Sequence, residues 1–250
     1  MRNILITLRF LGTRYHGWQV QENAKSVQEE VQNAVEAIFG SREALTGCSR
    51  TDSGVHANRY YCTLRTDRTM DCYRLMGALN AKLPEDIGVL ACRDVPDSFH
   101  PRYSAHSKQY VYKIYNGPGK NPFLQDRALA YHRPINADFL NQQAQDLVGT
   151  HNFTSFCANK EPVNGNIRTV KQASVTREGD LVLFTVEADG FLYNMVRIMV
   201  GTLLWINEGK REVGSIPAIL AKEDRTAAGL TAPACGLYLN QVFYEGSDTE

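Results

Sequence analysis

The residues best suited to chemistry lie in one short segment, Arg50-Thr-Asp-Ser-Gly-Val-His56. Asp52 stands in a tight, glycine-containing turn between two expected strands, with a guanidinium two residues before it and an imidazole four residues after it. An acid, a cation and a base gathered in one loop are typical of a functional site, because loops carry function on a rigid scaffold. The same spacing also fits an Asx turn, in which Asp52 binds the backbone and Arg50 is solvated. On spacing alone, the turn is the simpler interpretation.

Other catalytic motifs are missing from the sequence. It contains no glycine-rich phosphate loop, no H-E-x-x-H zinc motif and no G-x-S-x-G nucleophile turn. This argues against a nucleotide-dependent enzyme, a zinc hydrolase and a serine hydrolase. None of the six cysteines belongs to a C-x-x-C pair, so neither a structural zinc site nor a disulfide framework is indicated. A reducing cytoplasm is the simplest location for such a chain.

The composition is that of an ordinary globular protein. Of the 250 residues, 43% are hydrophobic and 22% are charged, which argues against a disordered or fibrous chain. No apolar run approaches the roughly 20 residues that a membrane-spanning helix needs, so we expect no membrane partner. The 27 basic residues balance 27 acidic ones. An RNA partner would therefore be bound by a local basic surface and not by net charge.

Hydrophobic periodicity predicts the element order β-α-β-β-α-β for the first half of the chain. Alternate residues from Ile4 to Phe10 are apolar, as in a strand with one buried face. Ser26 and Glu29 have the spacing of a capping box at the start of a helix. The six elements are expected at residues 3–10, 26–39, 43–49, 58–66, 71–83 and 87–95.

The second half is expected to repeat this order. Its first strand has Tyr110, Tyr112 and Ile114 on one face. The six elements are expected at residues 108–116, 136–148, 168–176, 181–188, 191–207 and 236–244, with a further short strand at 126–132.

Two such halves make an α/β (α+β) protein, in which two ferredoxin-like units with mostly antiparallel sheets meet at a central cleft. We expect an N-terminal half at residues 1–104, which carries the Asp52 loop. The C-terminal half is expected at residues 105–250 and includes the last strand.

The chain resembles the TruA family of tRNA pseudouridine synthases over nearly its whole length. Its segment Arg50-Thr-Asp-Ser-Gly-Val-His-Ala57 is similar to that family's catalytic segment. Further matching blocks are Gly12–Gln19, Phe99–Ala105, Lys108–Tyr112, Gly149–Phe156, Gly190–Gly201 and Ala232–Leu239. Because the blocks are ordered and one of them has an unusual composition, the resemblance is specific, and it implies the pseudouridine synthase fold.

The resemblance implies an isomerase that breaks the N-glycosidic bond of a uridine in RNA, rotates the base and joins its C5 to C1′ of the ribose. Neither a cofactor nor a metal is expected, because the reaction needs no group donor and no redox step. Asp52 corresponds to the family's catalytic aspartate, Arg197 to the arginine beside it, and Tyr110 to the ring that stacks on the target base. The route stays open: Asp52 could attack C1′, attack the base, or remove the 2′ proton.

Four further residues are expected near the RNA. By the resemblance, Arg50 corresponds to the arginine associated with base flipping, and Leu237 to an apolar residue that packs against the flipped base. His56 is a substrate-binding candidate, although a structural role in the catalytic loop is the preferred interpretation. Arg14, in the loop that follows the first strand, is also expected to touch RNA.

The resemblance further implies a tRNA substrate, modified in the anticodon stem-loop around positions 38 to 40, and a cytoplasmic homodimer. Two alternatives stay open: the same chemistry on another RNA, and a non-catalytic RNA-binding homologue on the same scaffold. Some positions depart from the family's pattern, such as Ser53 in place of a common alanine. None of the departures removes Asp52, Tyr110 or Arg197, and their retention argues against the non-catalytic alternative.

Overall fold

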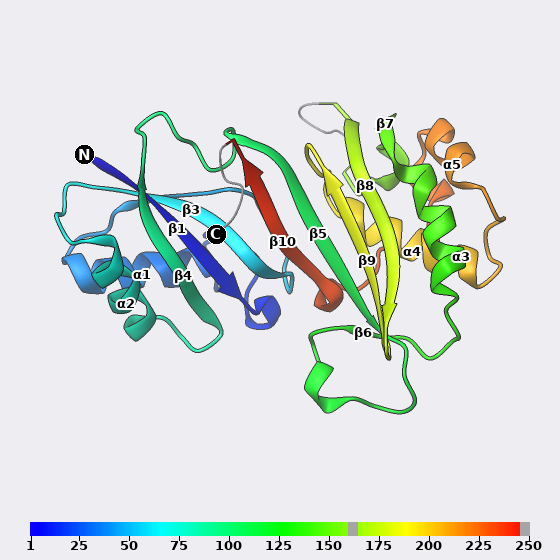
Figure 1. Ribbon diagram of the computed structural model, residues 1–250, viewed down its shortest axis with the longest axis horizontal. Helices are drawn as coiled ribbons and strands as arrows, with labels where there is room; N and C mark the ends of the chain where they lie inside the picture. The colour runs from blue at the N-terminus through cyan, green and yellow to red at the C-terminus, as the bar shows by residue number, and fades with distance from the viewer. Residues whose placement is uncertain (160–164, 246–250) are drawn as a thin grey trace. The chain divides into compact units, whose positions relative to one another are not determined.

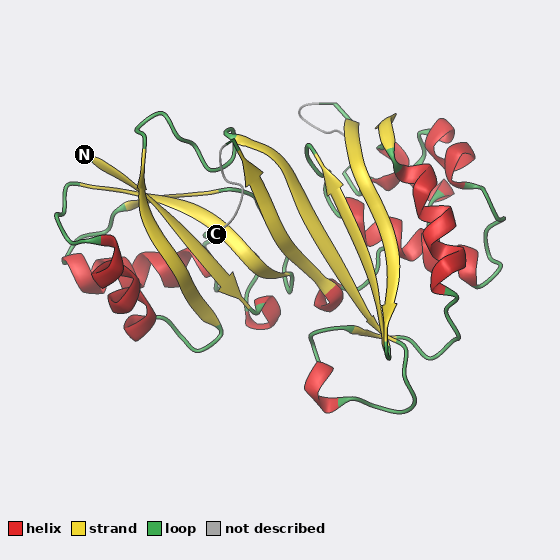
Figure 2. Ribbon diagram, viewed as in Figure 1, coloured by secondary structure: helices red, strands yellow, loops and turns green. Residues whose placement is uncertain are grey.

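The computed structural model describes residues 1–159 and 165–245, which form two compact units. Unit 1 comprises Met1–His106 and the chain from Tyr238 onward, and unit 2 comprises Ser107–Leu237. Figure 1 follows the chain by residue number, and Figure 2 separates helices from strands. The mixed α/β class is confirmed. The last strand departs from the prediction, because it groups with the first unit and not with the second.

Unit 1 is a mostly antiparallel sheet with two helices, and its first six elements confirm the predicted order β-α-β-β-α-β. In the sheet, β4 pairs with β1 and β1 with β3, all antiparallel, while β2 pairs antiparallel and β10 parallel with β3. The elements are β1 Arg2–Phe10, α1 Val27–Phe39, β2 Ala44–Gly47, β3 His56–Thr66, α2 Cys72–Lys82, β4 Ile87–Val95 and β10 Leu237–Tyr244.

Local sequence signals account for these elements. The alternating apolar residues from Ile4 to Phe10 are all buried, as a strand with one face on the core requires. The Ser26 hydroxyl accepts a hydrogen bond from the Glu29 N–H at 3.3 Å and so caps α1. The Asp71 carboxylate caps α2 in the same way. The helix boundaries therefore follow from residues that the sequence alone identifies.

Unit 2 is also mostly antiparallel, with neighbouring strands in the order β5, β9, β8 and β7, and with β6 parallel to β5. Its elements are β5 Ala105–Tyr115, β6 Leu129–Ala130, α3 Ala137–Ala144, β7 Gly149–Asn152, β8 Ile167–Glu178, β9 Leu181–Ala188, α4 Met195–Asn207 and α5 Ile216–Lys222. No helix within residues 1–159 and 165–245 has the length and apolar character needed to cross a membrane.

Unit 2 departs from the predicted order in several places. The strand expected at residues 126–132 is only Leu129–Ala130, while β7 and α5 are not predicted at all. The helix expected from residue 191 begins at Met195, because Asn194 has a left-handed backbone with φ 61°. The closing strand belongs to unit 1, where Tyr238 pairs with His56. The predicted order β-α-β-β-α-β is present as β5, α3, β8, β9, α4 and β10, but β6, β7 and α5 are added to it and its closing strand groups with unit 1.

Two glycines allow close backbone packing against α4. A Cβ added to Gly201 would lie 1.7 Å from the carbonyl oxygen of Leu230, and a Cβ added to Gly229 would lie 2.5 Å from backbone atoms of Gly201. The Gly229 N–H donates to the Thr202 hydroxyl at 2.8 Å, and that hydroxyl donates to the Ile198 carbonyl oxygen at 2.8 Å. The segment from Gly229 to Ala232 is consequently held directly on the helix.

We expect Gly201→Ala to lower the free energy of unfolding by about 2 kcal/mol or more, because the added methyl group overlaps the backbone of Leu230. Gly77→Ala is the matched control, since Gly77 lies in exposed α2 with no atom within 4 Å of its added Cβ. That control should be neutral or gain up to about 1 kcal/mol from helix propensity. Urea denaturation midpoints measure both changes, and equal midpoints for the two variants would contradict the packing argument.

Candidate active site

Asp52 lies in the loop of unit 1 that joins β2 to β3. It is half-buried, and its carbonyl oxygen accepts a hydrogen bond from the Val55 N–H at 3.2 Å. Gly54 has φ 79°, a conformation that suits glycine. The tight turn predicted from the sequence is thus confirmed, and Arg50, two residues before Asp52, is exposed beside it.

This turn is fastened to the loop between β1 and α1. The carbonyl oxygen of Tyr15 accepts hydrogen bonds from the Gly54 N–H at 3.1 Å and from the Ser53 hydroxyl at 3.4 Å. The Gly12 N–H donates to Nδ1 of His56 at 2.9 Å. The backbone on both sides of the turn is therefore held by groups that are distant in sequence.

Close approach of the two loops depends on two glycines. A Cβ added to Gly12 would lie 1.9 Å from the carbonyl oxygen of Val55, and one added to Gly17 would lie 2.1 Å from that of Thr51. Gly17 also has φ 84°, which other residues rarely adopt. Both glycines belong to the block Gly12–Gln19, so this block positions the Asp52 loop.

An aromatic pair supports the start of the same loop. The rings of Trp18 and Tyr60 stack with centroids 4.2 Å apart, and both residues are buried. The Tyr60 hydroxyl donates to the carbonyl oxygen of Ser49 and accepts from its N–H. A Cβ on Gly47 would collide with both rings, at 2.3 Å from the Tyr60 hydroxyl and 2.4 Å from Nε1 of Trp18. The chain that leads into Arg50 is thus held in place on the core.

Tyr15 is itself anchored by a carboxylate. Its buried hydroxyl donates to Oδ1 of Asp86 at 2.6 Å, while Nε of Arg14 donates to Oδ2 at 2.7 Å. Partial burial by itself would raise the pKa of Asp86, but the hydrogen bonds from Arg14 and Tyr15 outweigh it and lower that pKa below its usual value. Burial and the bond to Asp86 raise the pKa of Tyr15. Arg14, expected at the RNA, is exposed but already paired with a carboxylate.

His56 is fully buried, with its ring 4.6 Å from that of Tyr238. Because Nδ1 accepts the hydrogen bond from Gly12, the proton of the neutral ring resides on Nε2. This placement fits the structural role in the catalytic loop better than direct contact with a substrate.

Tyr110 lies on β5, in unit 2. It stands opposite Val186 in the pairing with β9, and its ring contacts that of Phe191 edge-on at 4.9 Å. Only 6% of the residue is exposed. Tyr112, on the same face, is fully buried and donates its hydroxyl to the carbonyl oxygen of Pro233 at 2.7 Å. Both rings are thus packed in fixed positions.

Arg197 projects from the first turn of α4, and its guanidinium has a fixed direction. Nε donates to the carbonyl oxygen of Ala232 at 2.7 Å, and Nη1 donates to Oδ1 of Asn194 at 2.8 Å. The Ala232 N–H in turn donates to the carbonyl oxygen of Arg197 at 3.0 Å. The side chain is half-buried, so it is a positioned cation and not a solvated charge on a helix surface.

Leu237 begins β10 and is 6% exposed. It follows Gly236, where a Cβ would lie 2.6 Å from the ring of Tyr112. This packing holds the start of the strand against β5.

Sequence reasoning identifies the Asp52 turn but misses Asp86 as the anchor of Tyr15. The glycine spacing in Gly12–Gln19 is the one signal that could have indicated a close contact. The Asp86 partner of Tyr15 could not be found, because the two residues are 71 positions apart and no sequence pattern links them. Among residues 1–159 and 165–245, no three His, Cys, Asp or Glu side chains gather closely enough to hold a metal ion.

We expect Tyr15→Phe to reduce the free energy of unfolding by about 1–2 kcal/mol at pH 7, because it removes a hydrogen bond to a partly buried carboxylate. Tyr73→Phe is the control, since Tyr73 is 80% exposed. Because the pKa of Asp86 is lowered in the folded protein, its stabilising contribution is present above the unfolded pKa and is lost as the pH falls through the folded value. Urea denaturation at pH 7 and at acid pH measures the difference in unfolding free energy between the wild-type protein and Tyr15→Phe. This difference should be smaller at acid pH, and a difference that does not change with pH would contradict the proposed role of Asp86.

Comparison with known proteins places these residues in a family. A family model described as tRNA pseudouridine synthase matches residues 6–104 and 143–245. The tRNA pseudouridine synthase A of Thermoanaerobacter sp. (strain X514) is 42% identical over 244 residues, 98% of this chain and 100% of the relative. The proteins of the same name from Clostridium acetobutylicum and Anoxybacillus flavithermus are 41% and 40% identical, again over 98% of this chain and 100% of each relative.

A solved structure, that of an H/ACA RNP bound to a substrate RNA containing 2'-deoxyuridine, has a TM-score of 0.38 and 14% identity, covering 81% of this chain and 45% of that chain. A likeness this weak supports no conclusion. The sequence matches are far stronger, since they extend over both units and include the Arg50–Ala57 segment with Asp52. The chain therefore belongs to the tRNA pseudouridine synthase A family.

Proposed function

We propose that this protein converts uridine to pseudouridine in tRNA, with Asp52 as the catalytic carboxylate. The observation that carries the proposal is the Arg50–Ala57 segment, which keeps the family's aspartate and arginine and forms a turn fixed from outside by Tyr15 and Gly12. A catalytic group must be held within a fraction of an ångström of its productive position. The bracing of this turn by Tyr15 and Gly12 supports such positioning.

The reaction is an isomerisation that balances within the substrate. The bond between N1 and C1′ breaks, the base rotates, and a bond forms between C5 and C1′, while C5 loses a proton and N1 gains one. An ionised carboxylate can act as the nucleophile at C1′, as the nucleophile at the base, or as the base that removes the 2′ proton. The position of Asp52 in a half-buried turn with Arg50 nearby is compatible with each route.

Two residues of unit 2 are proposed to complete the chemistry. Tyr110 would stack on the target base, and Arg197 would stabilise negative charge, on Asp52 or on the reacting base. The support is family membership together with fixed side-chain positions: Phe191 packs against Tyr110, and two hydrogen bonds aim the Arg197 guanidinium. Groups that are oriented before the reaction cost no reorganisation during it.

The substrate is proposed to be the anticodon stem-loop of tRNA, modified around positions 38 to 40 by a cytoplasmic homodimer. A uridine within a helix must leave the stack to reach a carboxylate. Arg50, exposed beside the Asp52 turn, would stabilise the opened stack, and Leu237 would pack against the flipped base. His56 is proposed to hold the catalytic loop in position and not to contact the RNA, because its side chain is fully buried.

Asp52→Asn should abolish pseudouridine formation, lowering turnover by at least about 10³-fold, the scale on which removal of a catalytic group acts. The Kd for tRNA should stay within about threefold, because binding rests mainly on phosphate contacts elsewhere. Asp67→Asn is the control, since Asp67 is an exposed carboxylate of the same unit. Turnover is measured as tritium release from tRNA labelled at C5 of uridine.

Retained turnover in Asp52→Asn would refute the catalytic assignment. Mapping pseudouridines in RNA from cells with and without the protein tests the substrate separately. Loss of modification in the anticodon stem-loop is the expected result, whereas loss in another RNA would keep the chemistry and change the target.

Tyr110→Phe should lower kcat by about 100-fold and leave KM for tRNA nearly unchanged, if the hydroxyl helps to remove the proton from C5 while the ring stacks on the base. Tyr193→Phe, at an exposed position before α4, serves as the control. Single-turnover tritium release measures the step directly. An unchanged kcat would restrict Tyr110 to stacking.

A further inference from the structure

We propose that the turn after β4 forms a second RNA-binding site, in which an unpaired base of the substrate stacks on Tyr103. The inference rests on the proposed function, because it concerns how the same RNA is held outside the catalytic loop. Tyr103 lies in unit 1 and is not one of the residues assigned above to the chemistry.

Tyr103 is a large aromatic residue with 77% of its surface exposed. The ring of His100 lies 4.3 Å from it, tilted by 33°, and the Arg102 guanidinium lies 5.8 Å from its centroid. An exposed aromatic ring beside a guanidinium is the combination that stacks bases of single-stranded nucleic acid.

The turn that presents Tyr103 is ordered by its own hydrogen bonds. Nδ1 of His100 accepts from the backbone N–H groups of Arg102 and Tyr103 at 3.1 and 3.3 Å. The N–H of His100 donates to the Ser104 hydroxyl at 3.1 Å, and the Ser104 N–H donates to the carbonyl oxygen of His100 at 2.9 Å. The exposure of Tyr103 is therefore a built feature of the turn.

The turn is also fixed to the sheet of unit 1. The Asn3 amide donates to the carbonyl oxygens of Pro96 and Phe99 at 3.0 and 3.1 Å. The Tyr244 hydroxyl donates to the carbonyl oxygen of Pro101 at 2.8 Å. A turn whose backbone is held in this way loses little conformational entropy when a base stacks on Tyr103.

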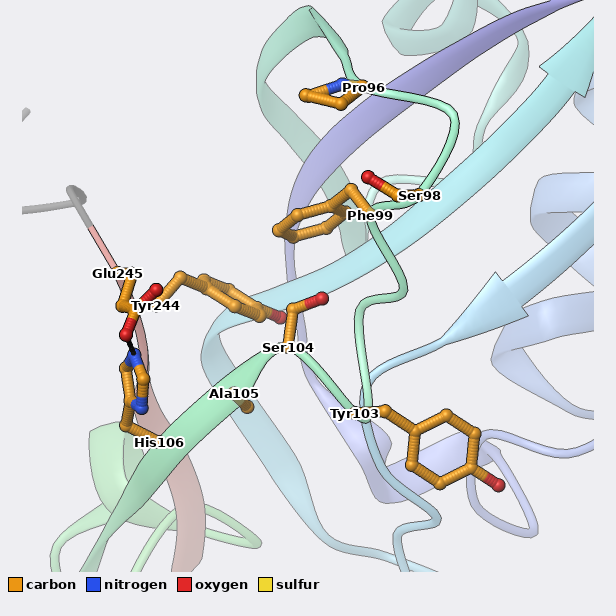
Figure 3. Close-up of a pocket in the computed structure, with 9 residues that line it drawn as sticks. All are labelled: Pro96, Ser98, Phe99, Tyr103, Ser104, Ala105, His106, Tyr244 and Glu245. Atoms are coloured by element: carbon orange, nitrogen blue, oxygen red, sulfur yellow. Dashed lines mark ion pairs between the residues drawn. The ribbon is translucent and has the colours of Figure 1, made fainter.

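A pocket of about 390 Å³ lies next to the ring (Figure 3). Its volume is within the range of about 300–1,000 Å³ found for small-molecule sites. Figure 3 shows Tyr103 at one side, and Tyr244 with the His106–Glu245 ion pair at the other. Its lining includes the rings of Phe99, Tyr103 and Tyr244 and the hydroxyl groups of Ser98 and Ser104. Aromatic rings and hydroxyl groups together suit a base and its ribose.

Two guanidinium groups beside the turn suit the phosphates of an RNA partner, although the turn also carries the exposed Asp97 carboxylate. Within residues 1–159 and 165–245, neither Arg65 nor Arg102 forms an ion pair with a carboxylate, and Arg65 donates instead to the carbonyl oxygen of Asp97 at 2.9 Å. Burial, followed by the positive charges of Arg102 and Arg65, lowers the pKa of His100. His100 is therefore a neutral aromatic neighbour at pH 7, while the two guanidinium groups are available to phosphate.

The test uses the full-length protein and a fluorescent tRNA transcript at one fixed ionic strength. Tyr103→Ala should raise the Kd by about 10-fold, the usual effect of losing one stacked base. Tyr103→Phe should stay within about twofold, because it keeps the ring. Tyr73→Ala is the matched control at an equally exposed tyrosine of unit 1, and it should leave the Kd unchanged. Thermal midpoints confirm that every variant is folded.

A direct measurement accompanies the affinities. Photocrosslinking of a transcript containing 4-thiouridine should yield an RNA adduct on the peptide with Tyr103. Arg102→Gln should reduce the slope of log Kd against log salt by about one, as expected for one lost phosphate contact.

The outcomes separate this inference from the proposed function. Equal Kd values for Tyr103→Ala and Tyr73→Ala would overturn the inference, even if the wild-type protein makes pseudouridine. A change in oligomeric state on sedimentation with no change in Kd would also overturn it, because the turn would then contact protein. Conversely, a wild-type protein that binds tRNA through Tyr103 but makes no pseudouridine would overturn the proposed function alone. A wild-type protein that binds no tRNA would overturn both.

Discussion

Two hydrogen bonds to the carbonyl oxygen of Tyr15 determine where the Asp52 turn stands in unit 1. They form only because the backbones of the two loops come very close, and Gly12 and Gly17 permit this by having no Cβ. The side chain of Tyr15 is buried and its hydroxyl donates to Asp86. The residue that holds the Asp52 turn is therefore itself fixed in the core of unit 1. The position of the Asp52 turn and the stability of unit 1 are thus coupled. Such coupling preorganises a site, because the packing that stabilises the fold also holds the reacting group in place.

Unit 2 uses the same physical means for Arg197. Gly201 and Gly229 let the chain lie directly on α4, and this contact brings the carbonyl oxygen of Ala232 to Nε of the guanidinium. Close backbone contact therefore positions the Asp52 turn in unit 1 and sets the direction of the Arg197 guanidinium in unit 2. Since net charge is zero, any attraction for RNA comes from local groups such as the exposed Arg50.

Much of unit 1 could be predicted because its signals are local. Alternation from Ile4 to Phe10 gives β1, and Ser26 and Asp71 mark the starts of α1 and α2. Unit 2 was harder, because β6 has only two residues and α5 only seven, too short for a clear period. Hydrophobic periodicity also misplaces the start of α4. The apolar residues before Met195 extend the helical pattern, but the left-handed backbone at Asn194 delays the start of the helix to Met195.

The sequence by itself determined the type of most elements, the Asp52 turn and the family, because short-range spacing and residue identity carry these. Only the tertiary structure decided that β10 joins unit 1, where Tyr238 pairs with His56. It also decided that Tyr15 is anchored on Asp86 and that His56 is buried. These contacts join residues far apart in the chain, and the free energy that selects them comes from packing, which no local pattern encodes.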